Sequence, residues 1–214
     1  MHTKTVAIVL IIMMILSITH IVKSRKDSIT ESGDKTPPPV IIDIPDAYWA
    51  RGYFEDINSL SAIAPWLPLR EVGIQTGDLE IRIWIGFGLD FLTGIRLCRI
   101  NDAWTGFYIQ SGMSVRISEV KPQTDWNVLW KKLETLGILD LPDSSTLPNE
   151  ELINDGIGYV VEINDGVHYR TYKYSNPQHQ KWSEAKQMVE IMKTLYTEFG
   201  MDRPVLQPQR GFLL

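Results

Sequence analysis

The sequence predicts an α+β domain: an antiparallel sheet of hairpins with two main amphipathic helices packed on one face, preceded by an N-terminal transmembrane or signal segment. Alternating apolar and polar residues with turn residues between them recur over residues 79–120 and 159–174. Two other segments, 126–136 and 182–199, carry apolar residues at helical spacing. An order of strands, helix, hairpin and helix is typical of an α+β domain.

The first 23 residues predict a transmembrane anchor or a signal segment. An apolar run from Val6 to Val22 follows Lys4, and basic residues come directly after it. The run is at the lower limit of what spans a bilayer as a helix, and it also fits the core of a signal peptide. We favour an uncleaved anchor through residues 4–23, because no A-x-A cleavage site follows the run; a cleaved signal is the alternative.

Residues 24–46 predict a Pro-rich linker. Three consecutive prolines, Pro37 to Pro39, favour an extended polyproline II spacer. The linker would hold a single α+β globular domain, residues 47–200, off the membrane, and residues 201–214 would form a tail. We expect a single-pass protein of the cell membrane with an extracytoplasmic domain. The excess of basic residues after the apolar run leaves a cytoplasm-facing domain open, and signal cleavage would give an exported protein.

Composition excludes several classes of protein and site. The net charge of −5 argues against a nucleic-acid-binding protein, which needs clustered Lys and Arg. A single Cys cannot form a disulfide framework or a Cys-based zinc site, and four scattered His predict no His-rich metal site. The glycine-containing segments match neither a P-loop nor a dinucleotide-binding motif. The sequence therefore predicts no metal, no cofactor and no nucleic-acid partner.

Strand patterns fill the first half of the predicted domain. A helix entrance is expected at Asp46, followed by an apolar loop that contains prolines. From residue 79 to residue 87, apolar residues alternate with Glu80, Arg82 and Trp84, as in a strand with two different faces. Further strands are expected at residues 95–100, 104–110 and 115–120. The short connections between these strands favour antiparallel pairing.

Two amphipathic helices are expected in the second half. Asp125 is a natural N-cap, and apolar residues then recur at helical spacing as far as Leu136. Gly137 supplies the C-terminal stop. The second helix spans Trp182 to Phe199 and is closed by Gly200. Both helices would cover the same face of the sheet with their apolar stripes.

The C-terminal hairpin leaves two registers open. Its strands flank the turn residues Asn164-Asp165-Gly166. A two-residue Asp-Gly turn would place Val161 opposite Arg170. A three-residue Asn-Asp-Gly loop, with its Gly in the left-handed conformation, would place Val161 opposite Tyr169. We favour the second register because it separates apolar from polar residues better.

The favoured register brings five candidate ligand-binding residues to one face. Glu162 would lie opposite His168, with Arg170 two positions along and Tyr172 and Tyr174 continuing the row. A carboxylate beside an imidazole suits acid–base chemistry, and Arg with Tyr suits an anionic or sugar-like ligand. Ordinary cross-strand pairs on a solvated face are the favoured interpretation, because no nucleophile, metal set or oxyanion motif accompanies them. No catalytic residue is assigned.

Arg82 and Trp84 form a second, smaller row of candidates. An Arg beside a Trp can make a cation–π platform for a ligand. A structural salt bridge with a packed Trp is the favoured interpretation. Cys98 is expected to be a small buried residue, because no sequence feature supplies the base or the accessible site that a catalytic thiolate needs.

A series of motifs runs through the C-terminal half. Its members are Trp126-x3-Trp130-x2-Leu133, Leu141-Pro142-Asp143, Asp155-Gly156-x2-Tyr159 and Tyr169-Arg170-x-Tyr172-x-Tyr174-x-Asn176-Pro177. The series resembles a group of uncharacterised bacterial proteins, commonly exported or membrane-linked, that carry a Trp-containing helix, an L-P element and an Asp-Gly-led hairpin. The likeness covers residues 125–199 and extends to parts of 77–104. It implies an envelope location and supplies neither an activity nor a functional residue.

The sequence as a whole predicts a membrane-tethered, non-enzymatic domain that binds a protein or a small ligand. An envelope hydrolase that uses Glu162, His168 and Arg170 is one alternative. An immunity-type or inhibitor protein is another, because the chain is small, acidic and suited to a protein partner.

Overall fold

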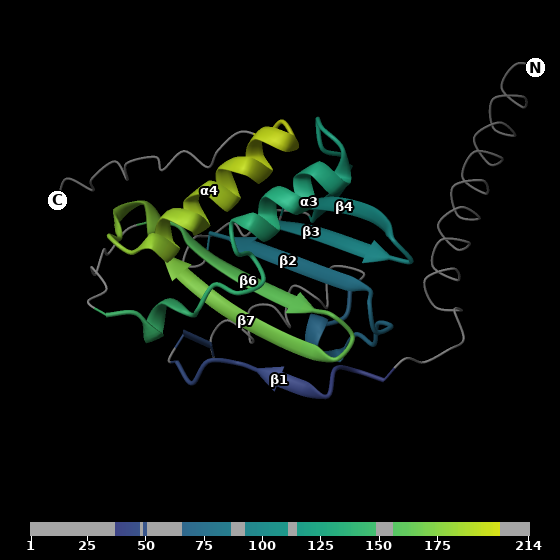
Figure 1. The fold of residues 1–214 in the computed structure, drawn as a ribbon, viewed down its shortest axis with the longest axis horizontal. Coiled ribbons are helices and arrows are strands. Elements are labelled where there is room, and N and C mark those ends of the chain that lie inside the picture. The colour runs from purple at the N-terminus through teal and green to yellow at the C-terminus, as the bar shows by residue number, and fades with distance from the viewer. Residues whose placement is uncertain are drawn as a thin grey trace, which may run out of the picture. The chain divides into compact units, whose positions relative to one another are not determined.

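Seven strands among the described residues form one mixed sheet, shown with its helices in Figure 1. The computed structural model describes residues 37–47, 49–50, 66–86, 93–110, 115–148 and 156–201. Described residues from Pro37 onward belong to one compact unit. The strands are β1 (Ile41–Asp43), β2 (Leu79–Ile85), β3 (Thr93–Ile100), β4 (Ala103–Gln110), β5 (Arg116–Val120), β6 (Gly158–Asn164) and β7 (His168–Ser175). Their order across the sheet is β1-β7-β6-β2-β3-β4-β5.

The sheet combines antiparallel hairpins with one parallel pair. Strands β2 to β7 pair antiparallel, as the sequence predicts, whereas β1 runs parallel to β7. The prediction of an antiparallel sheet is therefore wrong for the sheet as a whole. Residues 41–43 also lie inside the predicted linker 24–46. The strand β1 has three residues, with Pro39 before it and Pro45 after it. Three residues are too few to produce a recognisable alternation, so the sequence pattern does not reveal this strand.

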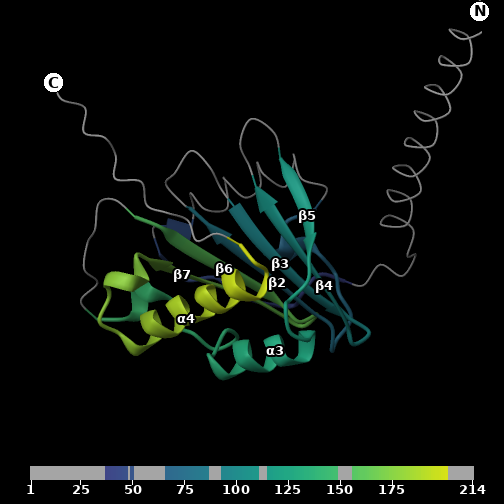
Figure 2. The same cartoon turned by 90° about the horizontal axis from the view of Figure 1, so that it is seen from above.

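Two helices cover one face of the sheet, which confirms the α+β class. They are α3 (Trp126–Thr135) and α4 (Ser183–Glu198), and Figure 2 shows both on the same side of the strands. Asp125 caps α3 by accepting a hydrogen bond from the Asn127 amide at 2.8 Å. Gly137 and Gly200 follow the two helices with positive φ angles of 80° and 61°. Single 3-10 turns are η1 (Leu69–Glu71), η2 (Ser144–Thr146) and η3 (Pro177–His179).

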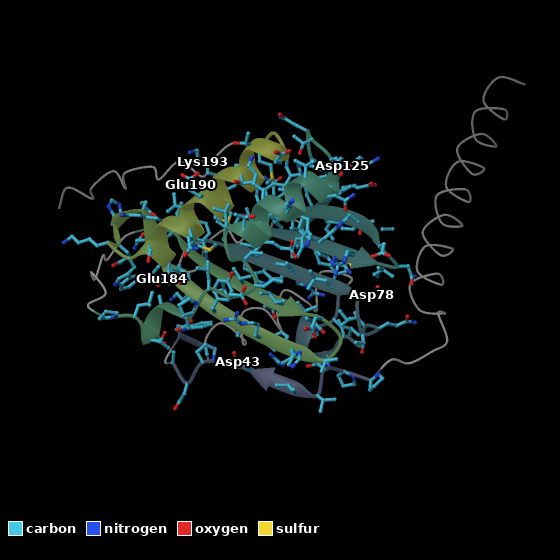
Figure 3. The ribbon with its side chains drawn as sticks, viewed as in Figure 1. Asp43, Asp78, Asp125, Glu184, Glu190 and Lys193 are labelled. Atoms are coloured by element: carbon cyan, nitrogen blue, oxygen red, sulfur yellow. The ribbon has the colours of Figure 1, made fainter. Side chains whose placement is uncertain are left out.

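The main apolar core lies between the helices and the face of the sheet that they cover, which we call the helix face. Alternate residues of β2 and the apolar stripes of both helices are fully buried there, and Trp130 joins them. The outer side of α4 is charged: Glu190 and Lys193, both labelled in Figure 3, form an exposed ion pair with an N–O distance of 3.2 Å. The helices are thus amphipathic in the sense that the sequence predicts.

The opposite face of the sheet, which we call the polar face, is also buried over the central strands β2 and β6. Trp84, Ile109 and Val160 form a second apolar cluster there, against which Trp49 and Trp66 pack. Every residue of β2 and of β6 is buried, so both faces of these two strands lie in the interior. The alternation of apolar and polar residues in β2 therefore distinguishes the apolar core on the helix face from a buried polar environment on the other face. It does not distinguish a buried face from a solvent-exposed one.

The β6–β7 hairpin adopts neither of the two registers predicted for it. Val161 lies opposite Tyr172, and Asn164 lies opposite Tyr169. The Asp165 amide donates to the His168 carbonyl oxygen at 3.1 Å, so the turn is formed by the two residues between them. Gly166 has a φ of +90°, and a Cβ there would lie 2.7 Å from the Gln75 carbonyl oxygen. A conformation that favours Gly thus accompanies a turn at Gly166-Val167, which begins one position after the predicted two-residue turn and two after the predicted three-residue loop.

Several predicted segments lie outside the described residues. They include the anchor or signal segment at residues 1–23, most of the linker before Pro37, and the tail from residue 202. Trp49 and Ala50 are helical, and the continuation of that predicted helix is likewise outside the described part. In the part that is described, no helix has the length and apolar character needed to cross a membrane.

Candidate functional site

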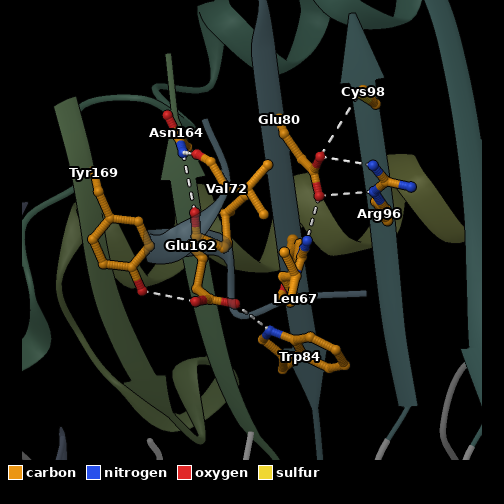
Figure 4. A network of polar contacts seen from close by, with 11 residues as sticks. Leu67, Val72, Glu80, Trp84, Arg96, Cys98, Glu162, Asn164 and Tyr169 are labelled. Atoms are coloured by element: carbon orange, nitrogen blue, oxygen red, sulfur yellow. Dashed lines mark hydrogen bonds and ion pairs between the residues drawn. The ribbon is translucent and has the colours of Figure 1, made fainter. Parts of the chain in front are cut away.

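Side chains from four neighbouring strands meet on the polar face and form the polar network shown in Figure 4. The network consists of Glu80, Arg82 and Trp84 from β2, Arg96 from β3, Glu162 and Asn164 from β6, and Tyr169 from β7. Strand register brings them together, because residues two apart on a strand share a face. Arg82 lies directly opposite Arg96 on one side and Glu162 on the other.

Glu80 is the anion that compensates the two arginines. Its Oε1 accepts hydrogen bonds from Arg82 Nε at 2.8 Å and Arg96 Nε at 2.7 Å, and its Oε2 accepts from Arg96 Nη2 at 2.7 Å. Two arginines placed opposite each other would repel without this carboxylate. Burial alone would raise the pKa of Glu80, but the charge of Arg82 and the bidentate contact of Arg96 outweigh it and hold the pKa below its usual value.

Glu162 is bound by two neutral donors. The Trp84 indole N–H donates to Glu162 Oε2 at 2.7 Å, and the Tyr169 hydroxyl donates to Glu162 Oε1 at 2.7 Å. All three side chains are buried. Burial, reinforced by the charge of Glu162, raises the pKa of Tyr169 well above its usual value, so this hydroxyl remains a donor. Both oxygens of Glu162 therefore have a partner inside the protein.

The segment from Trp66 to Val72 covers the network. Arg82 Nη1 donates to the Leu67 carbonyl oxygen at 2.8 Å, and Asn164 Nδ2 donates to the carbonyl oxygens of Leu69 at 3.1 Å and Val72 at 2.9 Å. The Arg96 guanidinium lies 4.9 Å from the centre of the Trp66 ring, within cation–π range. The network thus attaches an irregular segment to the sheet through that segment's own backbone oxygens.

Cys98 lies at the edge of the network and is buried, as the sequence predicts. Its Sγ is 3.8 Å from Glu80 Oε2. Burial and the nearby Glu80 carboxylate raise the pKa of the thiol to about 12. A thiol in that state is protonated at neutral pH, and only the thiolate is an effective nucleophile.

The seven predicted ligand-binding residues do not form one site. Arg82, Trp84 and Glu162 do meet, in the buried network. His168 lies at the turn, where its exposed ring is 3.2 Å from Asp165 Oδ2. The remaining predicted residues, Arg170, Tyr172 and Tyr174, share the helix face, because the observed register reverses the orientation of β7 relative to the one predicted.

The residues of β7 on the helix face bind the loop that follows α3. Tyr172 and Tyr174 are buried and donate to the carbonyl oxygens of Ile138 at 2.7 Å and Pro142 at 2.9 Å. Arg170 donates to Leu139 and Leu141 carbonyl oxygens, and its guanidinium lies near Asp43 of β1. Burial raises the pKa of both tyrosine hydroxyls above the usual range. The Tyr row predicted as a ligand surface is thus part of the core.

Four members of the network are absent from the predicted set: Glu80, Arg96, Asn164 and Tyr169. The signal that could have found them is the pairing of adjacent strands. Once β2 and β3 are aligned as a hairpin, Arg82 and Arg96 become opposite, and a buried anion such as Glu80 is then required on the same face. Asn164 and Tyr169 follow only from the β6–β7 register, which the sequence leaves open.

Asp143 of the Leu141-Pro142-Asp143 motif also has a role that the sequence does not reveal. Its Oδ2 accepts a hydrogen bond from the Lys173 amide at 2.8 Å. Among the described residues, the pairing of β1 with β7 ends at Arg170, three residues before Lys173. The other oxygen, Oδ1, accepts from the Ser145 amide at the start of η2. The buried carboxylate therefore supplies the Lys173 amide with the kind of acceptor that a neighbouring strand provides elsewhere in the sheet.

The chemistry available in the network is limited by its internal pairing. Both guanidinium groups bind Glu80, two neutral donors bind Glu162, and both acids are buried. Within the described residues, no group of three or more His, Cys, Asp or Glu is placed to hold a metal ion. The chain matches no known protein-family model, no curated protein and no solved structure in the comparisons made with each.

Proposed function

We propose that this chain is a membrane-tethered interaction domain that binds a protein or small-ligand partner and catalyses no reaction of its own. The observation that carries the proposal is the matching of donors and acceptors in the polar network. The network's two carboxylates, Glu80 and Glu162, are buried, and each accepts hydrogen bonds from two side chains. A general acid or base must reach its substrate and have a pKa near the working pH.

The geometry disfavours the hydrolase alternative. That alternative requires Glu162, His168 and Arg170 to converge in one pocket. Glu162 is buried on the polar face, Arg170 lies on the helix face, and His168 is exposed at the turn. Their separation supports an interpretation in which the charged residues stabilise the fold and the exposed surface makes the contacts with a partner.

The proposed location rests on the apolar run at residues 4–23, which we propose to be an uncleaved anchor. The domain would then lie on the extracytoplasmic side, joined to the anchor by a polar, Pro-rich linker. An anchor of this length depends on an uninterrupted apolar centre, where an Arg costs about 3 kcal/mol of insertion energy. The variant Ile12→Arg is therefore expected to move the chain from the membrane fraction to the soluble fraction.

Two experiments test the proposal. Reporter fusions after residue 214 and cell fractionation of the full chain measure its side of the membrane, and Ile12→Arg is the matched variant. For function, full-length chain in lipid vesicles is assayed on a broad hydrolase panel and used to capture partners, whose affinity is then measured with purified components. We expect no turnover and one saturable partner. Reproducible turnover that His168→Ala abolishes would falsify the non-enzymatic assignment.

A further inference from the structure

The two edges of the sheet differ in chemistry. The exposed edge strand β5 carries Arg116 and Glu119 among its five residues. Charges of this kind commonly protect an edge strand from pairing with another chain. At the other edge, three consecutive apolar residues are exposed: Val40 by 83%, Ile41 by 51% and Ile42 by 53%. The β1 edge, at the bottom of the sheet in Figure 1, therefore exposes a short apolar segment in which Asp43 is the one charged residue.

The backbone of β1 offers one residue to a further strand. The Ile41 amide donates to the Val167 carbonyl oxygen at 3.1 Å, so Ile41 directs its backbone groups toward β7. Successive residues of a strand point their N–H and C=O groups to opposite sides, which directs those of Ile42 away from β7. β1 is the last strand of the sheet at this edge among the described residues. Pro39 and Pro45 limit how far a ladder could extend.

We propose that this edge is a dimerisation interface, at which β1 of a second copy pairs antiparallel with Ile42 opposite Ile42. In an antiparallel ladder, residues whose backbone groups face each other exchange two hydrogen bonds. A two-fold axis perpendicular to the sheet generates this pairing from identical edges, as in the isologous interfaces of most homodimers. The two Ile42 residues satisfy each other's N–H and C=O groups, and the two sheets become one.

The register is self-complementary in its side chains as well. It places Val40 of one copy opposite Ile44 of the other, since a residue before proline favours an extended backbone that continues the strand direction. Ile42 and Ile44 of both copies then lie on one face. Ile41 lies opposite Asp43, so the two Asp43 carboxylates do not face each other. Each Asp43 keeps its contact with Arg170 of its own chain, at 4.0 Å.

A second copy fits this edge better than an unrelated extended peptide. Prolines on both sides of β1 prevent a long ladder, which an unrelated peptide would need for affinity. A shift that centred the pair on Asp43 would oppose two like charges, and a shift to Ile41 would use backbone groups already bound to β7. The register centred on Ile42 is the one that avoids both costs.

Cysteine cross-linking of the full chain in detergent micelles tests the register. In a hydrogen-bonded antiparallel pair the two Cα atoms are about 5.5 Å apart, within the range of a disulfide. Ile42→Cys is therefore expected to give a disulfide-linked dimer under mild oxidation. Val128→Cys, on the exposed side of α3, is the matched control and should give no disulfide-linked dimer. Native Cys98 is buried and does not compete.

A charged residue at the proposed two-fold axis gives the second test, which measures the strength of the dimer. Ile42→Lys brings two ammonium groups together and should weaken the dimer at least tenfold in sedimentation or light-scattering experiments. Ile117→Lys, on the partly exposed β5 edge, should leave it unchanged. Equal cross-linking of the Ile42→Cys and Val128→Cys variants would overturn the proposal. An oligomeric state that Ile42→Lys leaves unaltered would also overturn it, because self-association would then come from another part of the chain.

Discussion

Trp84 and Glu162 are joined across the β2–β6 pair by a diagonal hydrogen bond. Trp84 lies directly opposite Val160, and its indole N–H reaches along β6 to Glu162 Oε2 at 2.7 Å. Arg82, the residue directly opposite Glu162, instead donates to Glu80 and Leu67. The network therefore contains one carboxylate bound by guanidinium groups and one bound by neutral donors, and the two differ in what their removal leaves behind.

Glu162→Ala should destabilise the domain strongly. The substitution leaves the Trp84 indole N–H and the Tyr169 hydroxyl buried without an acceptor, at a cost of about 1–3 kcal/mol for each group. Urea unfolding followed by tryptophan fluorescence measures the loss. Glu162→Gln, which keeps one acceptor oxygen, should lose less. His168→Ala, at an exposed turn position, is the control, and we expect it to stay within about 0.5 kcal/mol of wild type. Equal stabilities for Glu162→Ala and His168→Ala would contradict the role given to Glu162.

Glu80 should make stability depend on pH in the acidic range. Its pKa is lower in the folded protein than the ordinary value of 4.5, so its ionised form stabilises the fold. That contribution is present above about pH 4.5 and is lost as the pH falls through the lowered pKa of the folded state. The difference in unfolding free energy between wild type and Glu80→Gln should therefore be largest near neutral pH and shrink in acid.

The matched control for Glu80 is Glu190→Gln, which removes an exposed carboxylate from α4. Both variants carry the same chemical change, so a general effect of losing one negative charge appears in both. We expect the control to stay within about 0.5 kcal/mol of wild type over the same pH range. A difference between wild type and Glu80→Gln that does not change with pH would rule out the proposed link to ionisation.

Local signals made the elements predictable from sequence. Asp125 and Gly137 mark the two ends of α3, and the periodicity between them is that of an amphipathic helix. The hairpin between β3 and β4 follows from its turn residues, Asn101 and Asp102, which both adopt positive φ angles. These features depend on residues close together in the chain, so a single sequence contains the information needed.

The register of β6 and β7 was not predictable in the same way. Separation of apolar from polar residues selects a register only where one face meets solvent. Here both faces are buried, and Tyr172 and Tyr174 reach the core through hydroxyls that bind backbone oxygens of another segment. Tyrosines counted as polar were in fact core residues. Asn164 and Tyr169 joined the polar network through this register, so these two members could not be found.

Cys98 should be unreactive in the folded chain. Its burial, together with the Glu80 carboxylate, raises the thiol pKa to about 12, whereas a thiol in an unfolded chain ionises near 9. At pH 8 the native protein should therefore react with a disulfide reagent many times more slowly than the urea-unfolded protein. A Val128→Cys variant provides an exposed thiol in the same fold as a positive control. Similar rates for native and unfolded wild type would show that solvent reaches Cys98.

Asp143→Ala should release the outer edge of β7. The buried carboxylate accepts hydrogen bonds from the Lys173 and Ser145 amides, and the substitution removes this acceptor from both. We expect destabilisation of about 1–3 kcal/mol. Hydrogen exchange localises the effect, because the Lys173 amide should exchange faster while amides of β2 change only with global stability. Asp140→Ala, at an exposed position three residues earlier, is the matched control and should change neither measurement. If the Lys173 amide remained protected in Asp143→Ala, another acceptor would have to hold this edge.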